Sequence, residues 1–332
     1  MAAQEARPVR AVSVLAAILA VLSILSLGRA VRAAESVSFD SVTPRNVDAF
    51  LDGLPKLPPM RLSAVLHLPP GALAPVPAVI IAHGSGGVSE SREGAWAARV
   101  VSWGYAALVV DSFAPRGIRE TATDQSQLST FANVADGFAA RVWLAGDSRI
   151  DARRIAVMGF SKGAVVALHA ATEPLRAAAG VGDLRFAAHV ALYPGCDVRY
   201  WSARQSTAPI LMLLAGDDDY TPPEPCRVHA EDLRRAGATV TLESYQGARH
   251  GFDRPVAVRF VPQVETVRGC AAVYDMDRRH WSMALGGAEV SGRELGDYFR
   301  RCRSRGAHIG GQDAALEGAI AAIRAHLVRA FE

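Results

Sequence analysis

The 332-residue sequence predicts an α/β fold, with a mostly parallel central sheet flanked by helices on both faces. Two observations support this prediction. Short apolar, β-branched runs such as VPAVIIAH (76–83) and PILMLLA (209–215) have the composition of strands that are buried on both sides. Segments with helical spacing stand between these runs, and such alternation is typical of a parallel sheet covered by helices.

The N-terminal segment has the order of a secretory signal peptide. Arginines precede an apolar run at 11–28, and small residues follow it, with Val31 and Ala33 at the two cleavage-site positions. We therefore expect residues 1–33 to be removed and residues 34–332 to be exported, to the periplasm or the medium, as one domain. The alternative is an uncleaved anchor, because the run is nearly long enough to span a bilayer, and only then do we expect contact with a membrane.

The composition argues against nucleic-acid binding. The net charge is only +3, and the arginines are scattered rather than gathered into a basic stripe between aromatic residues. We therefore expect a small-molecule partner and no nucleic acid.

Four cysteines, none in a C-x-x-C pair, make a zinc or thioredoxin-like site a poor interpretation. In an oxidising compartment an even number of cysteines suggests disulfides, with three connectivities open. We hypothesise the pairs Cys196–Cys226 and Cys270–Cys302. The alternative is four buried, unpaired cysteines, since free cysteine is often a plain core residue.

The remaining elements follow in chain order. Residues 35–59 are polar and dotted with prolines, so we expect irregular structure there. The sequence then predicts strands at 60–69, 76–83, 105–111, 154–160, 186–194, 209–215 and 238–245, and helices at 94–104, 130–144, 162–172, 222–237 and 314–331. Residues 255–311 are rich in arginine and glycine and give no clear elements.

The stretch GFSKG identifies Ser161 as a candidate nucleophile. Gly159, Ser161 and Gly163 fit G-x-S-x-G, with a predicted strand before them and a predicted helix after them, which is the context of a nucleophile elbow. The alternative is an ordinary serine at the start of a helix. In an elbow the backbone N–H of Lys162 would be one oxyanion donor, and its side chain needs no role.

A nucleophilic serine requires a base, and the base requires an orienting carboxylate. In this class the chain order is serine, acid, histidine. The strand at 209–215 runs into GDDDYTPP, which offers Asp217, Asp218 and Asp219, each with the alternative of a solvated turn or cap. His250 follows the strand at 238–245 in a loop without apolar flanks, which favours a functional histidine over a core one.

The loop HGSGG after the strand at 76–83 is the candidate for the second oxyanion donor. Its glycines allow the backbone to approach a substrate closely, and Ser85 would offer its backbone N–H. His83 precedes the serine in the chain, so we expect it to hold the loop rather than act as the base.

Together these stretches resemble the dienelactone hydrolase family of α/β-hydrolases. The residues that carry the resemblance are HGSGG (83–87), LVVDSFAPRG (108–117), RIAVMGFSKG (154–163), PILMLLAGDDDYTP (209–222) and ARHGFD (248–253). The resemblance implies an α/β-hydrolase fold, a nucleophile–Asp–His triad and action on an ester or lactone bond.

The resemblance also bears on single residues. The family's triad aspartate lies at a fixed distance before a proline, and counting from Pro222 gives Asp218, whereas counting from Gly216 gives Asp219. We choose Asp218. Arg116, in the P-R-G step, is a candidate clamp for a substrate carboxylate, with the alternative of a structural arginine that binds loop carbonyls.

Two features depart from the family pattern. The resemblance implies a cysteine nucleophile in the enzymes that give the family its name, whereas position 161 is serine. This difference puts dienelactone itself in doubt as the substrate. Residues 255–311 are also longer and less regular than the family's usual close, and we expect them to form a lid or a pocket wall.

The sequence therefore predicts an exported serine hydrolase acting on a carboxylic ester or lactone, with Ser161, His250 and Asp218 as triad. No metal or organic cofactor is implied, because the sequence contains no H-x-x-x-H or C-x-x-C pattern and no G-x-G-x-x-G pattern opens a predicted helix. The alternatives are a peptidase or acyltransferase on the same fold, or a non-catalytic binding protein, since one fold hosts many functions.

Overall fold

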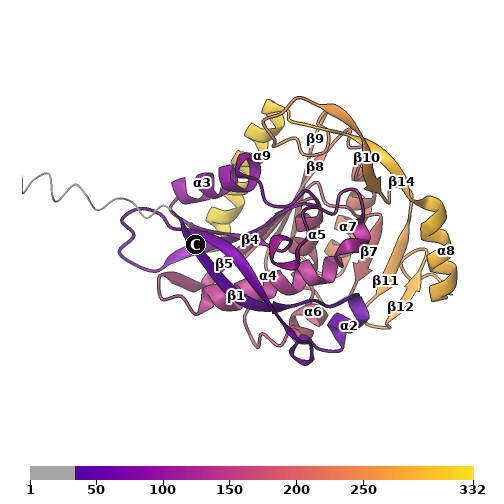
Figure 1. The fold of residues 1–332 in the computed structure, drawn as a ribbon, viewed down its shortest axis with the longest axis horizontal. Coiled ribbons are helices and arrows are strands. Elements are labelled where there is room, and N and C mark those ends of the chain that lie inside the picture. Colours follow the sequence, from indigo (N-terminus) through magenta and orange to yellow (C-terminus); the bar gives the residue numbers. More distant parts are fainter. Residues whose placement is uncertain (1–33) are drawn as a thin grey trace, which may run out of the picture. The chain divides into compact units, whose positions relative to one another are not determined.

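The centre of the protein is an eight-stranded sheet with the strand order β1-β2-β4-β3-β5-β6-β8-β9 (Figure 1). The computed structural model describes residues 34–332, so the predicted signal peptide lies outside the described residues. The two N-terminal strands pair antiparallel, and β2 pairs antiparallel with β4; all other neighbours are parallel. The strands are β1 Glu35–Val42, β2 Pro59–His67, β3 Val76–Ala82, β4 Ala106–Asp111, β5 Ile150–Phe160, β6 His189–Leu192, β8 Ile210–Ala215 and β9 Val240–Tyr245.

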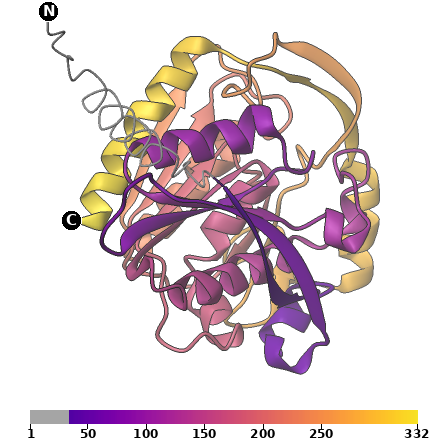
Figure 2. The same ribbon diagram turned by 60° about the vertical axis from the view of Figure 1, so that its left-hand side comes forward.

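Helices cover both faces of this sheet, because its parallel strands are apolar on both sides. In β3, Ala78 and Ile80 pack in one core layer, and Val79 and Ile81 pack in the other. Figure 2 shows the C-terminal helix along one face of the sheet. One face carries α2 Val47–Leu51, α4 Thr130–Ala145, α5 Lys162–His169, α6 Glu173–Ala178 and α7 Pro223–Arg235, and the other carries α3 Ala95–Ser102 and α9 Asp313–Phe331. The predicted fold class is thus confirmed.

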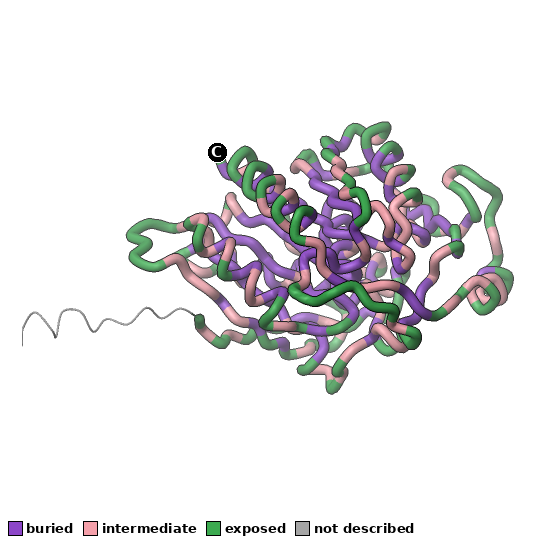
Figure 3. Tube along the Cα trace, turned by 90° about the horizontal axis from the view of Figure 1, so that it is seen from above, coloured by how far each residue is buried: buried purple, intermediate pink, exposed green. Residues whose placement is uncertain are grey.

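The central strands are the most deeply buried part of this unit, and Figure 3 shows exposed residues on the outer loops. No helix within residues 34–332 combines the length and the apolar character needed to cross a bilayer.

The prediction that residues 35–59 are irregular is wrong. Strand β1 pairs with β2 along its whole length, with Phe39 buried and Asp40 exposed. Its serines made the alternation hard to recognise in the sequence. Helix α2 begins after Asn46, whose side chain accepts a hydrogen bond from the backbone N–H of Ala49 (2.8 Å).

Residues 255–311 form short elements that the sequence did not reveal. They are β10 Arg259–Thr266, β11 Ala272–Asp275, β12 His280–Ser282, β13 Glu289–Val290, α8 Gly292–Cys302 and β14 Ser304–Ile309. Strands β10 and β14 pair with each other, and β11 to β13 extend β7 (Val198–Trp201) into a second sheet. These strands are two to eight residues long and several face solvent, so no apolar periodicity marks them.

Both hypothesised disulfides are present. Cys196 pairs with Cys226, with a Cα–Cα distance of 5.0 Å, and ties the segment after β6 to α7. Cys270 pairs with Cys302, with a Cα–Cα distance of 5.3 Å, and ties the turn before β11 to the end of α8. The second bond therefore closes the segment that the sequence left unplaced.

Four histidines outside the site are buried: His169, His189, His229 and His326. Each has one ring nitrogen without a hydrogen-bond partner within the described residues. Burial lowers the pKa of His169 and His229 to about 3, and that of His189 and His326 to about 4.

We expect the stability of the fold to fall in mild acid for this reason. An unfolded histidine titrates near 6.5, so below that pH the unfolded chain binds more protons than the folded one. Above about pH 7 these histidines should not lower the free energy of unfolding. Below that pH the free energy of unfolding should decrease toward pH 4, and at pH 5 the loss should be roughly 1–2 kcal/mol per histidine. Denaturant unfolding at pH 7.5 and 5 measures the loss, which His229→Gln should reduce. Equal stability at both pH values would contradict this account.

Candidate active site

Ser161 lies at the sharp turn between β5 and α5. Its backbone has φ 53° and ψ −113°, a conformation that costs a non-glycine residue about 1–3 kcal/mol. The turn is fixed by a hydrogen bond from the N–H of Ser161 to the carbonyl of Leu192 (3.0 Å). Such strain is typical of functional sites, and it places the side chain at the carboxyl edge of the sheet.

Only glycine fits two residues before and two residues after this serine. A Cβ at Gly159 would lie 2.0 Å from the carbonyl oxygen of Gly163, and a Cβ at Gly163 would lie 2.1 Å from that of Ala82. Strand, turn and helix therefore touch through bare backbone, which is the physical reason for the G-x-S-x-G spacing.

We expect Gly163→Ala to destabilise the protein by at least about 3 kcal/mol, because all three atoms that its Cβ would meet, in Ala82 and His83, belong to the backbone. The matched control is Gly292→Ala, where a Cβ meets nothing within 4 Å, and it should change stability by no more than about 0.5 kcal/mol. Thermal unfolding of both variants checks this, and equal midpoints would show that the elbow is not sterically closed.

His250 faces Ser161 from the loop that follows β9. Its Nε2 lies 3.0 Å from Ser161 Oγ. The rings of Tyr193 and Tyr220 pack against the imidazole, with centroids at 4.8 and 4.6 Å. The ring is buried and its backbone carbonyl accepts a hydrogen bond from Gly310 N (3.0 Å), so the base candidate is held on several sides.

Asp218 is the aspartate that reaches His250. Its Oδ2 lies 2.8 Å from His250 Nδ1, and its Oδ1 accepts hydrogen bonds from the N–H groups of Tyr220 and Thr221 (2.8 and 2.9 Å). The Thr221 hydroxyl also contacts Asp218 Oδ2 and His250 Nδ1, at 3.0 and 3.1 Å. Sequence reasoning gave Thr221 no role, since threonine is common in turns.

Asp219 points elsewhere. Its carboxylate contacts His308, at 2.8 Å from the backbone N–H and 2.7 Å from Nδ1. Asp217 contacts Gln246 at 3.5 Å. Of the three candidates left open by the aspartate run, the structure thus brings only Asp218 to the histidine.

Two backbone N–H groups are available beside the serine. Within the described residues, neither the N–H of Ser85 nor that of Lys162 donates a hydrogen bond. His83 holds the first of these loops: the N–H of Ser112 donates to His83 Nε2 (3.1 Å), so Nδ1 donates to the carbonyl of Gly84 (2.8 Å). The geometry matches the structural role expected for His83.

Arg116 does not reach the site. Its guanidinium is paired with both oxygens of Asp136 (2.8 and 2.9 Å) and donates to the carbonyls of Ser112 and Val42. Its side chain is only 4% exposed, and it lines neither cavity at Ser161. The interpretation of Arg116 as a carboxylate clamp is therefore corrected, because its donors are already used within the protein.

A buried polar network supports the loop that carries His250. Asp253 accepts hydrogen bonds from the Tyr193 hydroxyl (2.6 Å) and from Trp96 Nε1 (2.8 Å). The sequence HGFD contained this aspartate, but its partners lie far away in the chain. Nearby, the guanidinium of Arg92 pairs with Glu93 and lies 5.2 Å from the ring of Phe160.

Two cavities meet at Ser161. The first, the Phe299 cavity, has a volume of about 290 Å³. The second, the Arg254 cavity, has about 420 Å³ and is lined by His250 as well as by Arg254. Besides Ser161, both are lined by Ser85 and Tyr220.

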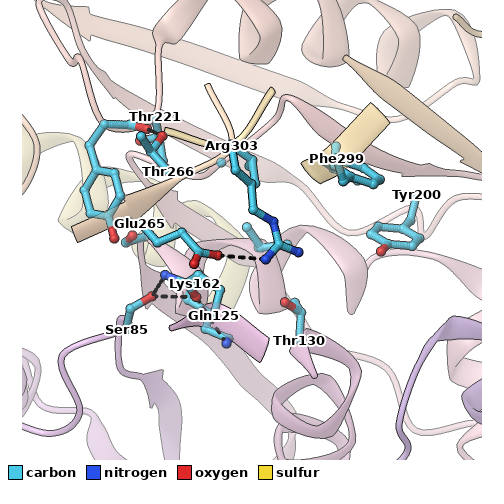
Figure 4. A pocket seen from close by; sticks show the side chains of 16 residues that line it. Ser85, Gln125, Thr130, Lys162, Tyr200, Thr221, Glu265, Thr266, Phe299 and Arg303 are labelled. Carbon is cyan, nitrogen blue, oxygen red and sulfur yellow. Dashed lines mark hydrogen bonds and ion pairs between the residues drawn. The ribbon is translucent and has the colours of Figure 1, made fainter. Parts of the chain in front are cut away.

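The side chain of Lys162 lines the Phe299 cavity. Its Nζ donates to the carbonyl of Leu128 (2.9 Å) and to Thr121 Oγ1 (3.3 Å), and it contacts Gln125 Oε1 at 3.4 Å. Gln125 in turn donates to Ser85 Oγ (3.0 Å), as Figure 4 shows. Burial lowers the pKa of this lysine to about 8. The amine thus connects the elbow to the loop at 121–128, a role that the sequence did not suggest.

The model of the dienelactone hydrolase family matches residues 62–275, which include every residue assigned to the triad and the oxyanion donors. The chain belongs to the dienelactone hydrolase family. It is therefore a hydrolase of the α/β-hydrolase superfamily, as the sequence resemblance predicted. The match spans the sheet from β2 to β9 and ends within the segment that follows the site histidine.

No curated protein matches the chain. Two solved structures show the same fold at low identity. A dienelactone hydrolase-like promiscuous phosphotriesterase, P91, from metagenomic libraries is 16% identical and has a TM-score of 0.53, over 90% of this chain and 100% of that one. The structure named m3DLH is 18% identical with a TM-score of 0.55, at the same coverage. Esterase 2 of Thermogutta terrifontis, phosphorylated by paraoxon, is 18% identical with a TM-score of 0.49, covering 68% of this chain and 86% of that one.

Proposed function

We propose that this family member is an exported serine hydrolase that cleaves a small carboxylic ester or lactone through an acyl-enzyme. The observation that supports this most is the unbroken chain of contacts from Ser161 Oγ to His250 Nε2 (3.0 Å) and from His250 Nδ1 to Asp218 Oδ2 (2.8 Å). A serine needs an adjacent base and an orienting carboxylate to become nucleophilic at neutral pH.

Acylation follows from this order. Ser161 Oγ attacks the ester carbonyl carbon and forms the new C–O bond while His250 Nε2 takes the hydroxyl proton. The bond to the leaving alcohol then breaks, and His250 returns the proton to the leaving oxygen. Asp218 accepts the Nδ1–H, which keeps the ring in the tautomer with a free Nε2 and stabilises its charged form.

Deacylation repeats the same proton transfers with water. His250 removes a proton from water as the water oxygen bonds to the acyl carbon. The acyl–Ser161 bond then breaks, His250 returns the proton to Ser161 Oγ, and the carboxylic acid leaves. In both steps the N–H groups of Ser85 and Lys162 would stabilise the oxyanion. This electrostatic stabilisation is usually the largest single contribution in such catalysis.

Export is supported by two independent features. The sequence of residues 1–33 has the order of a signal peptide, and both cysteine pairs in the described residues are disulfides. Structural disulfides persist in oxidising compartments and are rare in the cytosol.

One panel of substrates distinguishes an ester hydrolase from a peptidase, an acyltransferase and a binding protein. We expect turnover of p-nitrophenyl butanoate, and at least about 100-fold slower turnover of the matched p-nitroanilide. Added butanol should not divert the product from butanoic acid to butyl butanoate. A preference for the anilide would support a peptidase, transfer to butanol an acyltransferase, and no turnover of any of them a binding protein.

A further inference from the structure

The Phe299 cavity contains a carboxylate that no hydrogen bond satisfies. Glu265, near the end of β10, is 8% exposed, and within the described residues no hydrogen bond ends on its side-chain oxygens. Its backbone N–H donates to the carbonyl of Ala122 (2.7 Å), which fixes the main chain at this point. A buried carboxylate normally accepts several hydrogen bonds, because a buried acceptor without a hydrogen-bond partner costs free energy.

Two arginines offset its charge without completing its hydrogen bonds. Arg303 Nη1 lies 3.4 Å from Glu265 Oε1, and Arg305 Nη2 lies 3.9 Å from Oε2. Figure 4 shows the Glu265 carboxylate and the Arg303 guanidinium turned toward each other in the cavity. The cavity wall thus offers an acceptor and a donor side by side.

The position of His250 indicates which half of the substrate enters this cavity. The histidine must give its proton to the leaving oxygen, so the leaving alcohol lies beside Nε2. His250 lines the Arg254 cavity and does not line the Phe299 cavity. In the proposed reaction the alcohol would therefore enter the Arg254 cavity, and the acyl chain would enter the Phe299 cavity.

We propose that the Phe299 cavity recognises a neutral hydroxyl group on a short acyl chain, with Glu265 as acceptor and Arg303 as donor; this rests on the ester-hydrolase function proposed above. A hydroxyl group both donates and accepts, so it satisfies the pair. A carboxylate could pair only with Arg303 and an ammonium group only with Glu265, and each would then lie beside a like charge. The carbon chain packs on Val165, Tyr200 and Phe299, and a volume of about 290 Å³ is small for a ligand site.

The test compares two esters that differ only in this hydroxyl, ethyl 3-hydroxybutanoate and ethyl butanoate. We expect the wild type to prefer the hydroxylated ester by at least about tenfold in kcat/KM, as for a hydrogen bond to a charged group. Glu265→Gln keeps the size of the side chain and should reduce this ratio about tenfold. The ratio is taken within one enzyme, so a partly unfolded variant does not distort it.

Two further variants sharpen the result. Arg303→Met should also lower the ratio, because it removes the donor of the pair. Glu224→Gln makes the same substitution at a residue with a 77% exposed side chain, and both rates should stay unchanged. A wild-type ratio near one, or a ratio that survives Glu265→Gln, would overturn the proposal. If the wild type hydrolysed neither ester, the proposed ester hydrolysis itself would be overturned.

Discussion

Ser161→Ala is expected to lower kcat/KM for ester hydrolysis by about 10⁵- to 10⁶-fold, because it removes the oxygen that His250 Nε2 contacts and that would carry the acyl group. The substitution removes one oxygen atom from a turn whose shape is set by close backbone contacts at Gly159 and Gly163. The fold should therefore survive it. Alanine at this position has the same backbone strain as serine, because the strain comes from the φ and ψ angles and not from the hydroxyl group. Initial rates on p-nitrophenyl butanoate, together with the thermal midpoint, measure both effects.

His250→Ala is the matched companion to this variant. Residues that act as one unit are strongly non-additive, so the double variant Ser161→Ala/His250→Ala should be no slower than either single variant. Additive losses, or a serine variant that keeps more than about a hundredth of the activity, would show that the serine and the histidine do not act together.

Asp218→Asn is expected to lower kcat by about 10³- to 10⁴-fold while the protein stays folded. The amide group donates where the carboxylate accepts, so it favours the tautomer of His250 with the proton on Nε2. That tautomer cannot take the proton of Ser161. The Tyr220 and Thr221 N–H groups still find an acceptor in the amide oxygen, which keeps the turn intact.

Asp219→Asn provides the control for the same chemical change one residue away. Its carboxylate contacts His308 rather than His250, so kcat should change by less than about threefold. The pair of variants also decides between the two ways of counting along the aspartate run. A larger loss in Asp219→Asn than in Asp218→Asn would move the triad acid to the other residue.

The sequence predicted the sheet well where the strands are buried on both faces. Runs such as VPAVIIAH and PILMLLA have a single physical explanation, and the helices between them follow from their spacing. The elbow could be predicted for the same reason, because G-x-S-x-G gained meaning only from its strand and helix. Ser161 and His250 were then placed at one edge of the sheet by topology alone.

Other parts could not be predicted because their determinants are distant in the chain. Strand β1 is recognisable only through its pairing with β2, and the short strands of residues 255–311 depend on β7 and on the Cys270–Cys302 bond. Arg116 resembled a substrate clamp because Asp136, its partner, lies twenty residues away in α4. Glu265 had no recognisable neighbour in the sequence, and only the folded structure of residues 255–311 places it in the cavity.

The central claim is that Ser161 is an activated nucleophile, and covalent labelling with a fluorophosphonate tests it most directly. Peptide mapping by mass spectrometry should find one adduct, on Ser161, with fluoride released as the Oγ–P bond forms. The adduct should be absent in Ser161→Ala and strongly reduced in His250→Ala. A folded wild-type protein that takes no label, or that takes it at another residue, would contradict the account.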